Sequence, residues 1–395
     1  MPESSLSETC VPQVSLLTIA REWGRIGCIG FGGPPAHIAL LRGLCVDRRE
    51  WLSAAEFEDG VAATSLLPGP ASTQLAIFCA WRLRGPAGAL VGGACFIVPG
   101  LIIILALSAL FLAARPPLWV RGAAAGAGAA VPAVALAAAI GLVPASLKRV
   151  GPARPRRVRW ACYLLAGGLS AALIGPFLVV VLLGCGLIEL LLTARPRLAV
   201  GQSALLPALP GLAAKATAAG GLAGVAWVAF KVGALSFGGG FVIIPLMQAD
   251  AVTRYHWMTG AQFLDAVALG QITPGPVVQT VAVVGYAAAG VGGGLLASLI
   301  AFTPSFLFVL VGGPRFHQSR ANTAVAAFLA GAGPAVIGAI AGSSIPLGLA
   351  YQHLWQIPVL AGALLWLFVI RRGVVSGLLI AGAVGVILAL AGVPV

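Results

Sequence analysis

The most constraining feature of this chain is the length of its uncharged segments. No Asp, Glu, Lys or Arg occurs in residues 266–314, 321–370 or 373–395. One helix crosses the hydrocarbon core of a membrane in about 20 residues, so each of the two longer segments provides two crossings. Charged residues make up 9% of the chain, against about a quarter in a soluble domain. The sequence therefore predicts an all-α polytopic membrane protein with about 10 to 12 transmembrane segments.

The basic residues gather in short gaps between the apolar segments. The densest gap, residues 148–159, contains six cations, and the formal net charge of the chain is +13. Loops rich in Lys and Arg usually face the cytoplasm, so this gap marks a predicted cytoplasmic end. The lipid bilayer is therefore the expected partner and nucleic acid is not, although binding of nucleic acid by this one loop is a minor alternative.

The chain repeats itself at an offset of 206 residues. "RIGCIGFGG" at residues 25–33 matches "KVGALSFGG" at residues 231–239, and 17 of the 46 positions in 25–70 are identical to their partners in 231–276. Both copies end in Pro-Gly-Pro. The sequence therefore predicts two homologous transport repeats, residues 1–202 and 203–395.

The charges of two equivalent loops predict that the repeats are inverted. The loop Arg42–Glu50 carries three arginines, whereas its counterpart Gln248–His256 carries one. Because positive loops stay on the cytoplasmic side, the two loops are expected on opposite sides of the membrane. Paired halves interrupted by Gly and Pro at equivalent positions are typical of secondary transporters.

The Pro-Gly-Pro sequences predict broken helices. Proline removes a backbone donor and clashes with the preceding turn, so one helix stops before residue 68 and a second begins near Ala71. A break at membrane depth is tolerated where protein or a water-filled cavity receives the freed groups. The first amides of the second helix, with the hydroxyls of Ser72 and Thr73, form a predicted anion site. The Phe-Gly-Gly sequences predict a second break in each repeat.

A cation precedes the Phe-Gly-Gly break in both repeats, Arg25 in the first and Lys231 in the second. A charge inside an apolar segment is costly unless it has a partner or a task, so we expect this pair to supply positive charge to the anion. Snorkelling to the membrane surface is the alternative for either residue.

The other ionisable groups give weaker signals. Asp59 and Asp265 precede the Pro-Gly-Pro breaks by nine residues and are predicted to relay protons or to cap a helix start. His37 has no counterpart in the second repeat, where Ile243 occupies its position. The sequence contains no metal-ligand cluster, P-loop or nucleophile elbow, so no cofactor and no enzymatic activity are predicted.

The predicted anion-binding residues come from the four breaks and the segments beside them. They are Arg25, Phe31, Gly32, Gly33, Pro34, His37, Pro68, Gly69, Pro70, Ser72, Thr73, Gln74, Lys231, Phe237, Gly238, Gly239, Gly240, Pro274, Gly275, Pro276, Gln279 and Thr280.

Several of these segments resemble the chromate ion transporter family in its long, two-repeat form. They are "FGGPPAHIALLR", "RREWL", "LLPGPASTQLAI", "FGGGFVIIPLMQ" and "ALGQITPGPV". The resemblance implies export of chromate, a sulfate-like oxyanion, across the bacterial inner membrane. Two departures concern carboxylates: the family commonly has Asn-Ser-Thr-Glu where Ala71–Gln74 stand here, and often glutamate near Leu44 and Cys45. Both weaken the expectation of proton coupling more than that of anion binding.

The expected function is thus secondary export of chromate, which gives chromate resistance, by rocking one repeat against the other. The alternatives are a sulfate transporter, a passive anion channel and a membrane scaffold without transport activity. A homodimer is compatible with this organisation.

Overall fold

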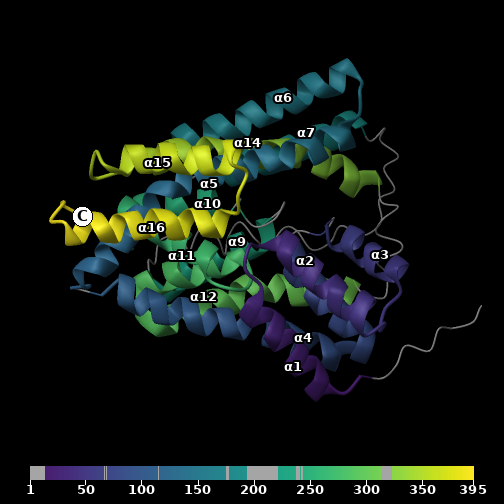
Figure 1. The fold of residues 1–395 in the computed structure, drawn as a ribbon. Helices are drawn as coiled ribbons and strands as arrows, with labels where there is room; N and C mark the ends of the chain where they lie inside the picture. Colours follow the sequence, from purple (N-terminus) through teal and green to yellow (C-terminus); the bar gives the residue numbers. More distant parts are fainter. Residues whose placement is uncertain are drawn as a thin grey trace, which may run out of the picture.

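The computed structural model describes residues 14–65, 67, 69–113, 115–174, 178–193, 221–236, 241, 243–312 and 323–395. All regular structure in these residues is helical (Figure 1). Four helices among them are long and apolar enough to cross a membrane: Ala71–Phe111, Leu118–Val150, Val277–Gly312 and Ala324–Leu349. The predicted all-α polytopic architecture is confirmed.

The same succession of elements occurs twice along the chain, so the chain contains two repeats, as predicted. The predicted boundary at residues 202 and 203 lies outside the described residues. The first contains α1 (Leu16–Ile29), α2 (Pro34–Arg42), the π-helical η1 (Gly43–Arg48), α3 (Ala54–Thr64), α4 (Ala71–Phe111), α5 (Leu118–Val150), α6 (Arg154–Leu169), the π-helical η2 (Ser170–Ile174) and α7 (Leu178–Thr193). The second contains α9 (Gly221–Leu235), α10 (Ile243–Gln248), the π-helical η3 (Ala249–Arg254), α11 (Gly260–Ile272), the 3-10 turn η4 (Val277–Gln279), α12 (Thr280–Gly312), α14 (Thr323–Leu349), α15 (Gln356–Leu364), the π-helical η6 (Leu365–Val369) and α16 (Val374–Leu390).

The first helices of each repeat are short and form hairpins. After α1 the chain returns through α2 and η1, so that Glu22 in the middle of α1 forms a 2.8 Å ion pair with Arg49, which follows η1. α3 and the first part of α4 form the next hairpin. An ion pair between Glu56 and Arg82 joins its two helices at the end away from the turn. In the second repeat Lys231 of α9 pairs with Asp250 of η3 in the same way. The Pro-Gly-Pro breaks are therefore turns of hairpins and not interruptions of straight helices.

α4 and α12 each reverse direction at one matching point. Arg84 and Gly85 have φ/ψ of −147°/26° and 57°/−150°, and Ala289 and Gly290 have −152°/31° and 62°/−154°. The positive φ values strain any residue except glycine, so the glycine at each reversal is required by the backbone. The near-identical angles show that both repeats make the same turn before their long membrane-crossing arm.

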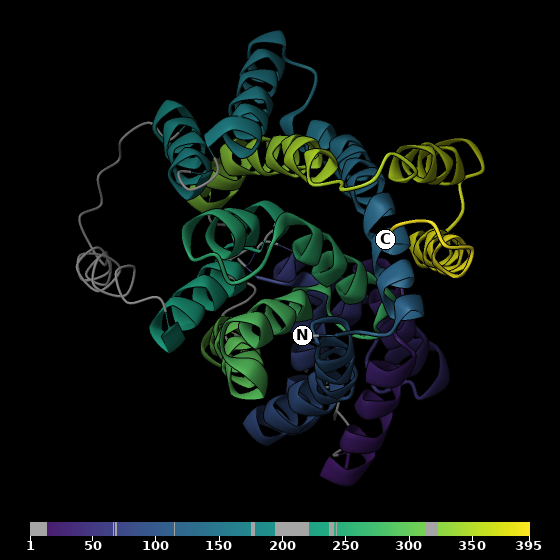
Figure 2. The ribbon, with the colours of Figure 1, turned by 90° about the vertical axis from the view of Figure 1, so that its left-hand side faces the viewer.

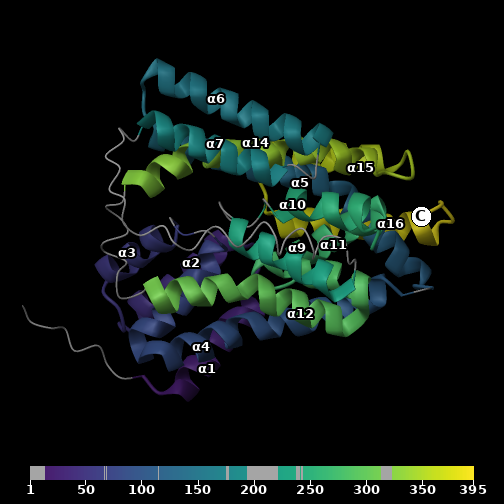
Figure 3. The same cartoon turned by 180° about the vertical axis from the view of Figure 1, so that it is seen from behind.

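The helices pack into two groups, which Figures 1 and 2 show as an upper and a lower layer. We call α1–α4 and α9–α12 the core bundle, and α5–α7 with α14–α16 the scaffold bundle. In the scaffold, α6 and α7 pack on α14 of the other repeat, and α15 and α16 pack on α5. Figure 3 shows from behind that α4 and α12 of the core lie side by side, as their contacts require. Both bundles thus interlock the two repeats.

Equivalent helices of the two repeats run in opposite directions. In the first half of α5, the carbonyl of Ala129 accepts a 2.6 Å hydrogen bond from the hydroxyl of Tyr351, which follows the end of α14. At the other end of α5, Val150 lines the same small cavity as Ala327 from the start of α14. α5 and α14 are therefore antiparallel, so the repeats are inverted.

Small residues allow the scaffold helices to approach closely. A Cβ on Gly167 of α6 would collide with the carbonyl oxygen of Ala335 in α14, and one on Gly338 with that of Leu164. Close packing of small residues drives helix association where lipid provides no hydrophobic force between helices. The high glycine content therefore has a structural role at these crossings.

Candidate functional site

The first break of the first repeat is a turn made by glycines. α1 ends at Ile29, and Gly32 and Gly33 then have φ of 98° and 72°, a conformation that strains residues with a Cβ. Pro34 begins α2, where the lack of a backbone N–H costs no helical hydrogen bond. Phe31 is 46% exposed. The equivalent residues Phe237, Gly238, Gly239 and Gly240, and Pro68 of the other break, lie outside the described residues.

The second breaks contain one left-handed glycine each, Gly69 with φ of 120° and Gly275 with φ of 99°. α4 begins at Ala71, as predicted, with Pro70 as its N-cap. The amides of Ala71 and Ser72 have no carbonyl within their own helix to bind and carry the positive end of the helix dipole. In the second repeat the 3-10 turn η4 separates Pro276 from α12.

The first break of the first repeat contacts the second break of the second repeat, because the amide of Gly275 donates a 3.0 Å hydrogen bond to the carbonyl of Gly30. The second break of the first repeat lies against helices of the second repeat. A Cβ placed on Gly69 would lie 3.3 Å from the carbonyl oxygen of Gly233 in α9 and 3.3 Å from Oγ of Ser305 in α12. The structure therefore brings segments of both repeats together at these breaks inside the core bundle.

His37 connects both breaks of the first repeat. Its Nε2 lies 2.9 Å from the carbonyl oxygen of Gly30, and its Nδ1 lies 3.2 Å from Oγ of Ser72. Because a carbonyl can only accept, Nε2 carries the proton, and in the neutral ring Nδ1 accepts from the Ser72 hydroxyl. Phe96 packs edge-on against the imidazole, with 5.1 Å between ring centroids. Ser72 thus donates a hydrogen bond to His37.

Buried polar atoms without partners surround the meeting breaks. Among the described residues, Oγ1 of Thr73, Oγ of Ser236 and of Ser305, and Oε1 of Gln279 have no hydrogen-bond partner. All four residues are at most 1% exposed. A buried polar atom left unpaired costs about 1–3 kcal/mol, so these atoms make the meeting breaks the candidate site for a polar ligand.

The remaining polar residues at the breaks have identified neighbours. Nε2 of Gln279 donates a 2.5 Å hydrogen bond to the carbonyl of Ile97, and Thr280 donates its hydroxyl to the carbonyl of Val277 at 2.8 Å. Gln74 is fully buried next to Gly69, where its Nε2 would lie 2.5 Å from an added Cβ. These contacts account for Nε2 of Gln279 and for the Thr280 hydroxyl, whereas the hydroxyls of Thr73, Ser236 and Ser305 remain unpaired.

The two predicted cations have different surroundings. Arg25 lies on the exposed face of α1, together with Arg21 and Cys28. The Lys231 side chain is only 11% exposed and forms an ion pair with Asp250, whose side chain is 3% exposed. Asp250 also lies 3.9 Å from a guanidinium nitrogen of Arg254. The charge of Lys231 is therefore compensated within its own hairpin, and that of Arg25 faces outward.

The two aspartates lie inside helices. Ser53 and Thr259 are the N-caps of α3 and α11, each in a capping box, so the alternative that Asp59 and Asp265 cap these helices is wrong. Asp265 lines a polar cavity of about 330 Å³ between α5, α11 and the α14–α15 connection, together with Gln262, Arg121, Gln352, His353 and Gln356. Of the two aspartates, Asp265 is thus the one placed beside this polar cavity.

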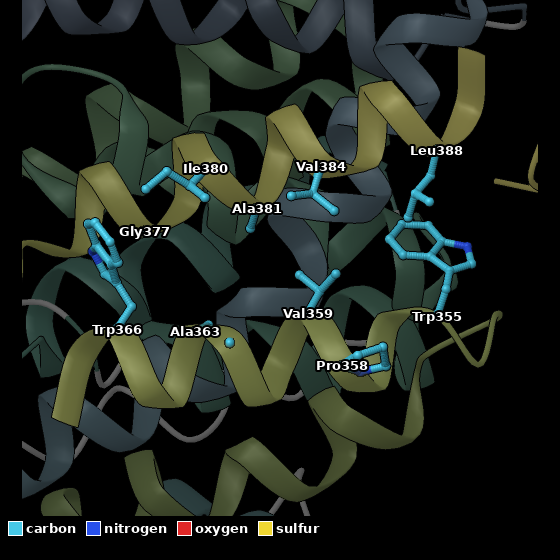
Figure 4. A pocket seen from close by; sticks show the side chains of 11 residues that line it. Trp355, Pro358, Val359, Ala363, Trp366, Gly377, Ile380, Ala381, Val384 and Leu388 are labelled. Atoms are coloured by element: carbon cyan, nitrogen blue, oxygen red, sulfur yellow. The ribbon is translucent and has the colours of Figure 1, made fainter. Parts of the chain in front are cut away.

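An apolar cavity lies elsewhere, between α15 and α16 (Figure 4). It has a volume of about 410 Å³, and Trp355 and Trp366 stand at its two ends. Its walls consist of aliphatic and aromatic side chains, which offer no set of donors for an anion. We therefore place the candidate site at the breaks of the core bundle.

Sequence reasoning missed Ser236 and Ser305. Ser236 follows α9 directly and lies 206 residues after Gly30, so it is the equivalent of Gly30 in the second repeat. Alignment of the two repeats could therefore have identified it as a residue of the break. Ser305 is equivalent to Gly100 once the glycines of the two helix reversals, Gly85 and Gly290, are aligned. A Cβ on Gly100 would collide with the carbonyl of Pro274, so each of the two positions adjoins a Pro-Gly-Pro break.

Inverted repeats of apolar helices, with broken hairpins meeting at a buried polar centre, define a membrane transporter. The sequence pattern of the chromate transporter family matches residues 17–190 and 223–390. The chain belongs to the chromate transporter family.

Curated relatives support this membership. A probable chromate transport protein of Synechococcus elongatus is 31% identical over 88% of this chain and 88% of its own length. A chromate transport protein of Cupriavidus metallidurans is 32% identical over 85% of this chain and 83% of its own. A chromate transport protein of Pseudomonas aeruginosa is 31% identical over 86% of this chain and 83% of its own length. No solved structure matches the chain.

Proposed function

We propose that the protein is a secondary transporter that exports chromate across the bacterial inner membrane, without converting it chemically, and so gives chromate resistance. The observation that carries the proposal is the group of unpaired buried hydroxyls at the meeting breaks. Chromate is a tetrahedral dianion whose oxygens accept hydrogen bonds. Thr73, Ser236 and Ser305 supply hydroxyl donors, and the first amides of α4 supply backbone donors.

In this mechanism the core bundle moves as one body against the scaffold bundle. The hydrogen bond between Gly275 and Gly30, and the contact of Gly69 with Gly233, join the repeats inside the core. Rocking one repeat against the other would break these contacts, whereas a movement of the whole core keeps them. The antiparallel repeats give the protein equivalent outward-open and inward-open forms around the same site.

Asp265 is our candidate for proton coupling. Its cavity contains Gln262, Gln352 and His353, which allow water to reach the carboxylate from one end of the protein. Asp265→Asn is expected to abolish uphill chromate transport driven by a proton gradient while leaving exchange of chromate for chromate. Asp59→Asn serves as the matched control in the other repeat. If both variants keep uphill transport, neither carboxylate couples the protons.

Flux in proteoliposomes tests the function directly. Purified protein should move labelled chromate against its gradient when a proton gradient is imposed, and sulfate in the same assay identifies the preferred oxyanion. Chromate movement only down its gradient would identify a passive channel. Absence of both binding and flux for the two anions would leave a membrane scaffold as the function.

The orientation of the protein is tested by labelling introduced cysteines. We place Arg157, at the basic start of α6, on the cytoplasmic side, and Leu354, after α14, on the other. Arg157→Cys should react with a membrane-impermeant reagent only in inside-out vesicles, and Leu354→Cys only in right-side-out vesicles. The opposite pattern would reverse the assigned orientation.

A further inference from the structure

A small basic cavity lies in the scaffold bundle, away from the breaks. It has a volume of about 90 Å³ and forms where the end of α5 meets α6, α7 and the start of α14. Arg149 and Arg156 line it together with Trp160, and Ala327 of α14 lines it from the other repeat. The cavity thus joins helices of both repeats at the basic end of the protein.

The carboxylate in this cavity is already neutralised. Glu189 has a side chain that is 8% exposed, and its two oxygens accept hydrogen bonds of 2.8 and 2.9 Å from Arg159. Tyr163 donates a further hydrogen bond of 3.1 Å to the same carboxylate. Arg149 and Arg156 therefore leave the cavity with an excess of positive charge, which suits an anionic group.

The surface next to the cavity is apolar and exposed. On α6 the side chains of Leu165 and Leu169 are 60% and 58% exposed, and on α7 that of Leu191 is 69% exposed. In a membrane protein such a surface faces lipid chains. Cations at the end of a helix followed by exposed leucines on the same helix match the two parts of a phospholipid, a charged head group and its acyl chains.

We propose that this cavity binds the phosphate of an anionic phospholipid, with the acyl chains lying along α6 and α7. Two arginines can each direct N–H groups to phosphate oxygens. Trp160 also lines the cavity, and tryptophan is enriched at the depth of lipid head groups. Since the cavity joins α6 and α7 of one repeat to α14 of the other, the bound lipid braces the scaffold bundle. The proposal is independent of the transported anion.

The test compares two double variants that remove the same charge. R149Q/R156Q alters the cavity, and K148Q/R154Q alters exposed cations of the same segment that do not line it. Phosphatidylglycerol added to delipidated protein should raise the melting temperature of wild type and K148Q/R154Q. Its affinity for R149Q/R156Q should fall about thirtyfold, the effect expected for the loss of two cations near an anionic lipid. Equal affinity for both double variants would overturn the proposal.

Further arms identify the source of the phosphate. Phosphatidylcholine should have little effect, and an equal rise in melting temperature with inorganic phosphate or sulfate alone would show a free-anion site and overturn the proposal. Phosphatidylglycerol carrying a fluorescence quencher near its head group should quench wild-type fluorescence more than that of Trp160→Phe. This arm needs no arginine variant, so it decides the question if R149Q/R156Q does not fold, and quenching that is unchanged in Trp160→Phe would refute the site.

Discussion

The carbonyl oxygen of Gly30 accepts two hydrogen bonds, one from the amide of Gly275 at 3.0 Å and one from Nε2 of His37 at 2.9 Å. The first bond crosses from one repeat to the other, and the second leads through the imidazole to Ser72. One carbonyl therefore links three of the segments that surround the candidate site. A change in the position of this carbonyl should therefore alter binding of the anion at the candidate site.

Gly30→Ala should disturb this link. Its Cβ would lie 2.7 Å from Cδ2 of His37 and 2.8 Å from the carbonyl oxygen of Ile26, so the imidazole must move. We expect a loss of stability of about 1–3 kcal/mol, as for other overpacked sites, and loss of chromate flux. Gly43→Ala is the control, since a Cβ there meets nothing within 4 Å and the backbone is helical. Melting temperature and flux are the measurements, and wild-type flux in Gly30→Ala would show that the link is dispensable.

Thr73→Val should change stability and binding in opposite directions. The Thr73 hydroxyl is buried without a partner, so its removal should stabilise the anion-free protein by about 1–3 kcal/mol. If the hydroxyl donates to the anion, affinity for chromate should fall about tenfold. Thr64→Val is the control, because that buried hydroxyl already donates to the carbonyl of Gly60 at 2.9 Å. Unchanged chromate affinity in Thr73→Val would remove this hydroxyl from the site.

The Lys231–Asp250 ion pair allows its structural and functional roles to be separated. Asp250→Leu alone leaves the nearly buried Lys231 without its partner and should destabilise the protein by about 3–5 kcal/mol. Lys231→Met alone leaves Asp250 with only the more distant Arg254, 3.9 Å away, and should also be destabilising. The double variant should recover stability, because the equivalent of Asp250 in the first repeat is Leu44, which is buried in the same kind of hairpin. Thermal unfolding measures this recovery.

Transport by the double variant then decides the role of the cation. If Lys231 exchanges Asp250 for the anion during transport, the stable double variant should bind chromate at least tenfold more weakly than wild type. If the pair only closes the α9–α10 hairpin, flux should return with stability. The second result would withdraw Lys231 from the anion site.

Much of the architecture was predictable because it depends on local chemistry and on the repeat. The uncharged segments predicted the membrane helices, and Pro70 predicted the start of α4 at Ala71. The match of "FGG" and "PGP" at one offset predicted that the breaks occur twice. Whether the chain turns back or continues straight after each break was not predictable. A Pro-Gly-Pro sequence stops a helix equally well in both cases. The outcome depends on contacts between distant residues, such as that between Glu56 and Arg82.

The composition of the candidate site was only partly predictable for the same reason. His37 has no counterpart in the second repeat, yet it joins Gly30 to Ser72 across two breaks. The repeat relates Lys231 to Arg25, but their surroundings differ because Asp250 is matched by Leu44. The role of a charged or polar residue depends on its partners in space. When these partners are distant in the sequence, the spacing of residues does not identify them.

The backbone amides at the start of α4 can be tested without altering any polar side chain. Ala71→Pro removes the N–H of residue 71 and keeps the helix start, because proline is favoured at the first helical position. Pro70 already has the extended conformation that a following proline requires, with ψ of 101°. If this amide binds the anion, the loss of one hydrogen bond to a charged group, about 1.5–3 kcal/mol, should weaken chromate binding about 10- to 150-fold.

Leu118→Pro at the start of α5 is the matched control for Ala71→Pro. It also follows a proline N-cap with an extended backbone, Pro117 with ψ of 151°, and lies far from the breaks in the scaffold bundle. It should leave chromate affinity unchanged, and both variants should retain the wild-type melting profile. Calorimetric titration with chromate measures the affinities. If Ala71→Pro binds as wild type while Thr73→Val loses affinity, the side chains hold the anion and the helix terminus does not, because the only donor lost in Ala71→Pro is the backbone amide.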